Sequence, residues 1–235
     1  MGLKIKNSKN IVTDGLVLNL DASDSISNPG SGSTWYDRSG NDYNSTLING
    51  PVFSSANGGA IVFDGSNDRA TFTTPIGASS SQTYEIWTNI IASSGAAGGF
   101  AYLLHNNSSS NSTGNSYLHI GVSNNGKYTA ALNGQYVNMN TGVVASNSNI
   151  VQIILTWDGA TQKNYINAVL KNAESLSGSV QNFSTTTGMG DAVSANANGY
   201  REVQGRVYSV KIYNKALTQD EISQNYNATK SRFGL

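Results

Sequence analysis

Short runs of alternating apolar and polar residues recur along this chain, and each run is bounded by glycine, serine, asparagine or proline. A period of two is that of a half-buried β-strand, because successive side chains of a strand point to opposite sides of a sheet. In the run 150–157, Ile154 breaks the alternation, which predicts partial cover on that strand's second face. The other predicted strands are 15–21, 60–63, 69–73, 83–91, 99–104, 117–122, 128–132 and 206–213.

Residues 164–170 have the pattern of a β-hairpin, with Asn167 and Ala168 between two apolar pairs. A two-residue hairpin turn of the primed types favours glycine at the place that Ala168 occupies. We therefore expect a longer loop here.

One helix is predicted, close to the C-terminus. Thr218 and Glu221 have the spacing of a capping box, and Leu217 and Ile222 have that of a hydrophobic staple. The helix should begin at Thr218 and run to about Asn227. About ten short strands, one terminal helix and no strand-helix alternation predict an all-β fold of two packed antiparallel sheets.

The balance of charges limits the partners of this chain. Charged residues make up only 12%, against roughly 25% in an average soluble protein, and 14 basic residues match 14 acidic ones. No net field attracts nucleic acid or an anionic membrane. The chain has no cysteine, so disulfides and thiolate metal sites are excluded and the packed core must supply the stability.

The chain divides into a polar, basic arm (residues 1–10) and one domain (residues 11–235). The first residues contain no apolar run of the kind found in a signal peptide, and no stretch approaches the roughly 20 apolar residues that cross a bilayer. We therefore expect no membrane insertion. An adhesive composition without an export signal suits a protein released by cell lysis, as virion proteins are.

Short motifs follow one another along residues 15–226. They are Gly15-Leu16-Val17-Leu18, Trp35-Tyr36-Asp37 with Ser39-Gly40-Asn41, Ile61-Val62-Phe63-Asp64-Gly65, Tyr84-Glu85-Ile86-Trp87, Leu155-Thr156-Trp157-Asp158-Gly159, Tyr165-Ile166-Asn167, and Gly205-Arg206-Val207 through Ile212-Tyr213-Asn214-Lys215-Ala216-Leu217 with Glu221-Ile222. In this order they resemble the laminin-G-like members of the concanavalin A-like lectin/glucanase superfamily. Ala168 departs from the pattern, since relatives usually carry glycine after Asn167.

This resemblance implies a jelly-roll sandwich that is often assisted by calcium and often binds glycans or proteins. The C-terminal residues 225–230 and 232–235 also resemble the tails of laminin-G-like proteins in phage virions, especially those of phages of marine cyanobacteria. The three tryptophans, Trp35, Trp87 and Trp157, fall in framework motifs, which favours packing in the core over a sugar platform.

The acidic residues do not have the pattern of an enzyme of this superfamily. Its glucanases resemble one another in carrying two glutamates about four residues apart on one strand, at the separation that retaining hydrolysis needs. Here Glu85, Glu174, Glu202 and Glu221 are far apart. His105 and His119 are not accompanied by a Gly-x-Ser-x-Gly motif. We expect no catalytic activity.

Two groups of residues are candidates for ligand binding. In the strand 117–122 the alternation predicts that Tyr117 and His119 face outward, where a tyrosine can stack on a sugar ring and a histidine can donate a hydrogen bond. The alternative is that both are ordinary polar surface residues. Asp191 and Asn196, with Asn198, form a second candidate in a loop rich in glycine and asparagine.

The turn that contains Asp64, Asn67 and Asp68 is a candidate metal site. Ca²⁺ takes six to eight oxygen ligands, which carboxylates, amides and carbonyls supply. The alternative is plain turn chemistry, because Asp and Asn side chains bond their own backbone. We expect no required cofactor, with Ca²⁺ as the one candidate ion.

Together these features predict a non-enzymatic protein of the phage virion surface, either a capsid decoration or a fibre component. It would contact other virion proteins and copies of itself, and its lectin-like domain would adhere to host-surface glycans. The alternatives are a free carbohydrate-binding module and, as a third reading, a glycan-cleaving enzyme.

Overall fold

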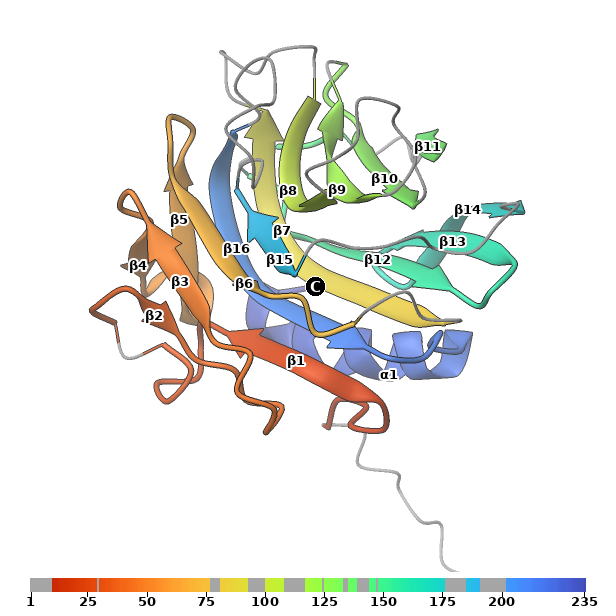
Figure 1. Ribbon diagram of the computed structural model, residues 1–235, viewed down its shortest axis with the longest axis horizontal. Helices are drawn as coiled ribbons and strands as arrows, with labels where there is room; N and C mark the ends of the chain where they lie inside the picture. Colours follow the sequence, from red (N-terminus) through yellow and green to blue (C-terminus); the bar gives the residue numbers. More distant parts are fainter. Residues whose placement is uncertain are drawn as a thin grey trace, which may run out of the picture.

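Two antiparallel sheets packed face to face form most of the described chain (Figure 1). This computed structural model describes residues 10–28, 30–76, 81–92, 100–107, 117–123, 125–132, 135–138, 144–146, 148–175, 185–190 and 202–235. One α-helix lies behind both sheets in the view of Figure 1. The predicted all-β sandwich with a C-terminal helix is confirmed.

Sheet A contains the longest strands. Its order is β14 (Val169–Ser175), β13 (Thr161–Ile166), β12 (Val151–Trp157), β7 (Gln82–Ala92), β16 (Val203–Tyr213), β5 (Ala60–Asp64) and β4 (Val52–Ser54), with β1 (Leu16–Asp21) beside the second half of β16. Strand β16 therefore pairs with β5 along its first half and with β1 along its second.

Sheet B lies in front of sheet A in Figure 1. Its order is β11 (Gln135–Asn138), β10 (Tyr128–Leu132), β9 (Tyr117–Ser123), β8 (Phe100–Asn107), β15 (Thr186–Met189), β6 (Arg69–Thr73), β3 (Ser45–Ile48) and β2 (Thr34–Trp35). The sequence pattern missed β2, β3, β4, β11 and β15, because two to four residues are too few for an alternation to be recognised.

The core between the sheets follows the predicted alternation. Val151, Ile153, Leu155 and Trp157 of β12 all lie in it. Ile154 faces the other way and is fully buried in a second apolar cluster with Tyr213 and Ile222. The predicted cover on the second face of this strand is confirmed, and it is complete rather than partial.

The helix α1 (Gln219–Thr229) supplies that cover. Thr218 is its N-cap, and the predicted capping box with Glu221 is present. Leu217 and Ile222 are both buried in the same cluster. The 3₁₀-helix η3 (Lys230–Phe233) follows and lies near the short η1 (Ala56–Gly58). Among the described residues, no helix has the length and apolarity needed to span a membrane.

All three tryptophans are buried, as predicted. Trp35 and Trp157 lie between the sheets, whereas Trp87 lies on the outer face of sheet A. There the ring of Trp87 stacks on Tyr226 at 5.7 Å and contacts Phe233 at 4.8 Å. The C-terminal segment is therefore part of the fold and covers an aromatic surface.

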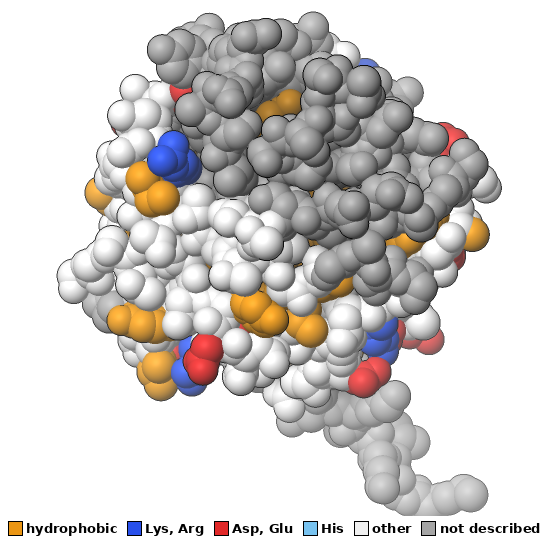
Figure 2. All heavy atoms as spheres, viewed as in Figure 1, with side chains coloured by type: hydrophobic (Ala, Val, Ile, Leu, Met, Phe, Trp, Pro, Cys, Tyr) orange, Lys and Arg blue, Asp and Glu red, His pale blue; other side chains and the backbone are white. Residues whose placement is uncertain are grey.

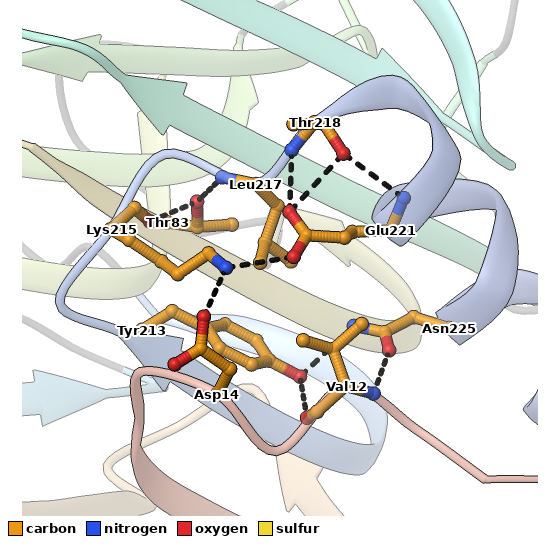
Figure 3. A network of polar contacts seen from close by, with 9 residues as sticks. All are labelled: Val12, Asp14, Thr83, Tyr213, Lys215, Leu217, Thr218, Glu221 and Asn225. Carbon is orange, nitrogen blue, oxygen red and sulfur yellow. Dashed lines mark hydrogen bonds and ion pairs between the residues drawn. The ribbon is translucent and has the colours of Figure 1, made fainter.

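A network of polar contacts fastens α1 to sheet A and to the start of the domain (Figure 3). The buried Asn225 accepts a hydrogen bond from the Val12 backbone (2.8 Å) and donates to the Tyr213 hydroxyl (2.9 Å). Lys215 forms ion pairs with Asp14 (2.6 Å) and Glu221 (2.7 Å). The first residues of the domain are thus held against the helix.

The hairpin between β13 and β14 has a tight two-residue turn. Ile166 pairs with Val169, and both Asn167 (φ 51°) and Ala168 (φ 62°) have left-handed backbone conformations. The expectation of a longer loop is wrong. The turn strains the backbone at Ala168, because residues other than glycine and asparagine are disfavoured in a left-handed conformation.

Replacing Ala168 with glycine is expected to raise the free energy of unfolding by about 1 kcal/mol, because glycine adopts this conformation without a Cβ clash. Denaturant unfolding measures the change. Asn167→Gly is the contrasting variant: it should destabilise, since it removes the hydrogen bond from the Gln152 backbone to the Asn167 side chain (2.9 Å). A loss of stability in Ala168→Gly would contradict the assignment of strain.

Candidate functional site

One row of directly opposed residues crosses every strand of sheet B. Along the strands from β2 to β10 in the sheet order, the neighbours of the row, such as Phe72 and Ile120, face the core between the sheets. The row therefore lies on the outer face of the sheet. Its members from β2 to β10 are Thr34, Thr46, Thr71, Gly188, His105, His119 and Ala131, and the backbone pairing continues to Tyr136 of β11.

The row has two halves that meet at Gly188, which has no side chain. On one side, the threonines of β2, β3 and β6 are at least partly exposed, and Thr73 and Thr186 form a second opposed pair beside them. The face looks toward the viewer in Figure 2, where its described part is mainly neither hydrophobic nor charged. This half offers hydroxyl groups that donate and accept hydrogen bonds.

The other half contains both histidines of the chain. His105 and His119 are opposite each other on β8 and β9. The ring of Tyr102 stacks on His105 at 4.3 Å and meets His119 edge-on at 4.7 Å. The Nε2 atom of His119 lies 2.8 Å from the hydroxyl of Thr129. These contacts form a compact aromatic cluster on the outer face of sheet B.

The histidine of the predicted site is buried. His119 faces away from the core, as the alternation predicts, but it has no exposed surface, so the expectation of a solvent-facing histidine is wrong. Packing against Tyr102 and the contact with Thr129 contribute to this burial. The side chain of Tyr117 lies outside the described residues, as do Asp191, Asn196 and Asn198. The roles proposed for these residues stay predictions.

Sequence reasoning missed Tyr102 and His105 as neighbours of His119. The two histidines are 14 positions apart in the sequence, and they meet because the pairing register of β8 with β9 places them opposite each other. That register includes an irregularity between Tyr102 and Leu104, which shifts His105 onto the outer face. Alternation in the sequence does not reveal such a shift.

The turn with Asp64, Asn67 and Asp68 links β5 of sheet A to β6 of sheet B. The Asp64 carboxylate accepts a hydrogen bond from the Ser66 backbone (2.8 Å), and the Asp68 carboxylate accepts one from the Asp64 backbone (3.0 Å). Among the described residues, no three His, Cys, Asp or Glu side chains gather as metal ligands. These contacts favour the turn interpretation, and calcium binding stays a prediction.

The ionised carboxylate of Asp68 is expected to destabilise the folded protein at neutral pH. Burial raises the pKa of Asp68, and the charge of Asp64 raises it further, against the opposing effect of the hydrogen bond from the Asp64 backbone. An acid whose pKa is raised on folding destabilises the protein above that pKa. Asp68→Asn keeps an acceptor oxygen and should therefore raise the free energy of unfolding at pH 7 by up to about 1 kcal/mol.

This gain should vanish as the pH falls below the ordinary aspartate pKa of about 3.9, because the wild-type carboxyl is then neutral in both states. Thermal unfolding across pH, with and without added Ca²⁺, makes the measurement. A large stabilisation by Ca²⁺ that Asp68→Asn abolishes would instead establish the metal site.

A laminin-G family model, described as the concanavalin A-like lectin/glucanases superfamily, matches residues 64–223. The chain belongs to this superfamily. Comparison with curated protein sequences gives no significant match.

Solved structures of similar fold include toxin domains and a domain of an enzyme. The binding domain of Paraclostridial Mosquitocidal Protein 1 has a TM-score of 0.67 at 18% identity, over 92% of this chain and 52% of that one. The binding domain of botulinum neurotoxin DC, in complex with SialylT, has a TM-score of 0.67 at 14% identity over the same shares. This superfamily member thus spans about half the length of these toxin binding domains.

A third structure matches over nearly its whole length. Domain 4 of the extracellular arabinanase AbnA from Geobacillus stearothermophilus, in complex with arabinotriose, has a TM-score of 0.64 at 14% identity. The match covers 90% of this chain and 98% of that domain. At such identities the likeness establishes a common lectin-like fold.

Proposed function

We propose that this chain is a non-enzymatic, lectin-like domain that binds glycans on the outer face of sheet B. The observation that carries the proposal is the threonine half of the row across that sheet, whose hydroxyls are at least partly accessible. Sugar hydroxyls can donate hydrogen bonds to these groups and accept hydrogen bonds from them. The buried cluster of Tyr102, His105 and His119 lies beside the threonines and supports the sheet from within.

The structural neighbours support a glycan as the ligand. Both the neurotoxin binding domain and domain 4 of the arabinanase are described as complexes with glycans, SialylT and arabinotriose. Because the described part of the outer face of sheet B is mainly uncharged (Figure 2), we favour a neutral glycan. Several copies on one particle would turn a weak single site into strong adhesion.

The position of Glu85 supports the absence of catalysis. Its carboxylate is fully buried on the outer face of sheet A, where it pairs with Lys211 (3.4 Å) and accepts a hydrogen bond from Asn225 (2.6 Å). It is thus engaged in the fold beneath α1, away from the face proposed to bind the ligand. Release of reducing ends from a polysaccharide by the purified protein would overturn this part of the proposal.

We further propose that the protein lies on the surface of a phage virion, as a capsid decoration or a fibre component. It rests on the resemblance of the C-terminal residues to those of phage virion proteins. The contacts of Asn10 and Val12 with α1 support attachment through the arm, because they hold the start of the domain on the side opposite the outer face of sheet B. An anchored domain would then present that face outward.

Mass spectrometry of purified phage particles tests whether the protein is part of the virion, and cryo-electron microscopy locates it on the particle. Ordered copies on the head would establish decoration, and copies at fibre tips would establish adhesion. Deletion of residues 1–10 should release the protein from the particle; retention after deletion would count against the arm. Absence of the protein from particles would overturn the virion location. The second candidate function would then be a free carbohydrate-binding module, which the match with nearly the whole arabinanase domain favours.

Replacing Thr71 with tryptophan is expected to weaken glycan binding at least about tenfold, because the indole would cover the middle of the threonine half. Calorimetric titration with a glycan selected on an array of neutral and acidic oligosaccharides makes the measurement. Thr161→Trp is the matched control, since Thr161 is a partly exposed strand threonine of sheet A. Equal affinity in both variants would exclude the outer face of sheet B.

A further inference from the structure

A shallow depression lies where the edge strands of the two sheets meet. Strand β4 ends sheet A and β2 ends sheet B. The depression has a volume of about 280 Å³, close to the lower limit of small-molecule pockets, which suits a single ring. Its lining residues are Asn28, Gly30, Ser31, Gly32, Thr34, Leu47, Pro51, Val52 and Phe53.

The exposed ring of Phe53 is the main apolar feature of this depression. The residue is 37% exposed and its neighbour Val52 is 59% exposed, although both are large hydrophobic residues. Across from the ring, Gly30 has a φ of +80°, and a Cβ there would lie 3.7 Å from the Phe53 ring. A residue with a side chain at this position would cover the ring, so glycine keeps it open to a ligand.

The lining selects an uncharged ligand. Among the described residues that line the depression, none is charged, and the polar members are Asn28, Ser31 and Thr34. The side chain of Asn28 is largely buried, and it is held in place by a hydrogen bond from the Gly30 backbone (2.9 Å). An aromatic face with nearby amide and hydroxyl groups fits a neutral sugar ring and would not compensate the charge of an acidic one.

The depression is continuous with the row on sheet B. Thr34 belongs to both, since it lines the depression and is the first member of the row, opposite Thr46. We propose that the depression is a subsite for one neutral sugar ring at the β2 end of the glycan site. This inference rests on the proposed function, because it extends the same site beyond the face of the sheet.

The test uses the full chain and simple neutral probes. Methyl glycosides of glucose, galactose and arabinose are added to isotope-labelled protein, and the amide resonances are followed by NMR, with N-acetylneuraminic acid as the charged comparison. A neutral probe should shift the amides of Gly30, Gly32 and Thr34. Phe53→Ala should weaken its binding about tenfold.

Tyr36→Ala is the matched control, because Tyr36 is exposed to a similar extent (43%) but does not line the depression. Loss of binding in Phe53→Ala and normal binding in Tyr36→Ala would support the subsite. Shifts confined to Thr71, Gly188 and His105, with wild-type affinity in Phe53→Ala, would overturn the subsite and leave the proposed function intact. Absence of binding to any glycan would overturn both.

Discussion

Replacing Lys211 with methionine is expected to lower the free energy of unfolding by about 3–5 kcal/mol. Lys211 and Glu85 form an ion pair whose side chains are 3% and 0% exposed. The methionine would fill the space of the lysine stem but would leave the Glu85 carboxylate buried without its cation. An uncompensated buried charge is among the largest penalties that a single substitution can cause.

The double variant Glu85→Gln with Lys211→Met should regain much of this loss. It removes both charges, and the glutamine can still accept the hydrogen bond that Asn225 donates to Glu85. Lys171→Met on the edge strand β14 is the control and should change stability by less than about 0.5 kcal/mol. Chemical denaturation of the four proteins gives the comparison. A double variant no more stable than Lys211→Met would show that packing, not charge, explains the loss.

Asp37→Ala is expected to lower the free energy of unfolding by about 3 kcal/mol or more. The buried Asp37 carboxylate accepts hydrogen bonds from the backbones of Asn19 (2.8 Å), Ser39 (2.8 Å) and Tyr43 (3.1 Å), and from the Ser39 hydroxyl (2.7 Å). It therefore ties the long loop after β1 to that strand. Alanine would leave all four donors without this partner.

Asp24→Ala in the same loop provides the control. Asp24 forms a salt bridge with Arg38 in which both side chains are more than a third exposed, so its loss should cost less than about 1 kcal/mol. Asp37→Asn should fall between the two, since one amide oxygen replaces two carboxylate oxygens. Similar melting curves for Asp37→Ala and Asp24→Ala would contradict the structural role of Asp37.

The two sheets use their outer faces differently. On sheet A, α1 and η3 cover Trp87, Tyr208 and Ile154, so this face contributes to stability. On sheet B, the threonine half of the outer face is at least partly accessible. This division is the physical reason for assigning the candidate glycan site to sheet B.

Much of the fold could be predicted from the sequence. Strands β6 and β10 agree with the predicted ranges to the residue. In β6 the apolar Ala70 and Phe72 alternate with polar residues, whereas β10 is a short, mostly apolar run that is buried throughout. The start of α1 was equally well specified, since the capping box of Thr218 and Glu221 is a local interaction within four residues. The ordered motifs also led to the superfamily that the family model confirms.

The sequence by itself thus determined the elements whose signals are local: period, caps and turn residues. Only the tertiary structure decided which residues meet. His105 lies opposite His119 because of a strand register, and Glu85 pairs with Lys211 across 126 residues of sequence. Thr34 and Phe53 line one depression because the edges of two sheets converge there. Such contacts depend on long-range pairing and packing, which the local periodicity of a sequence does not specify.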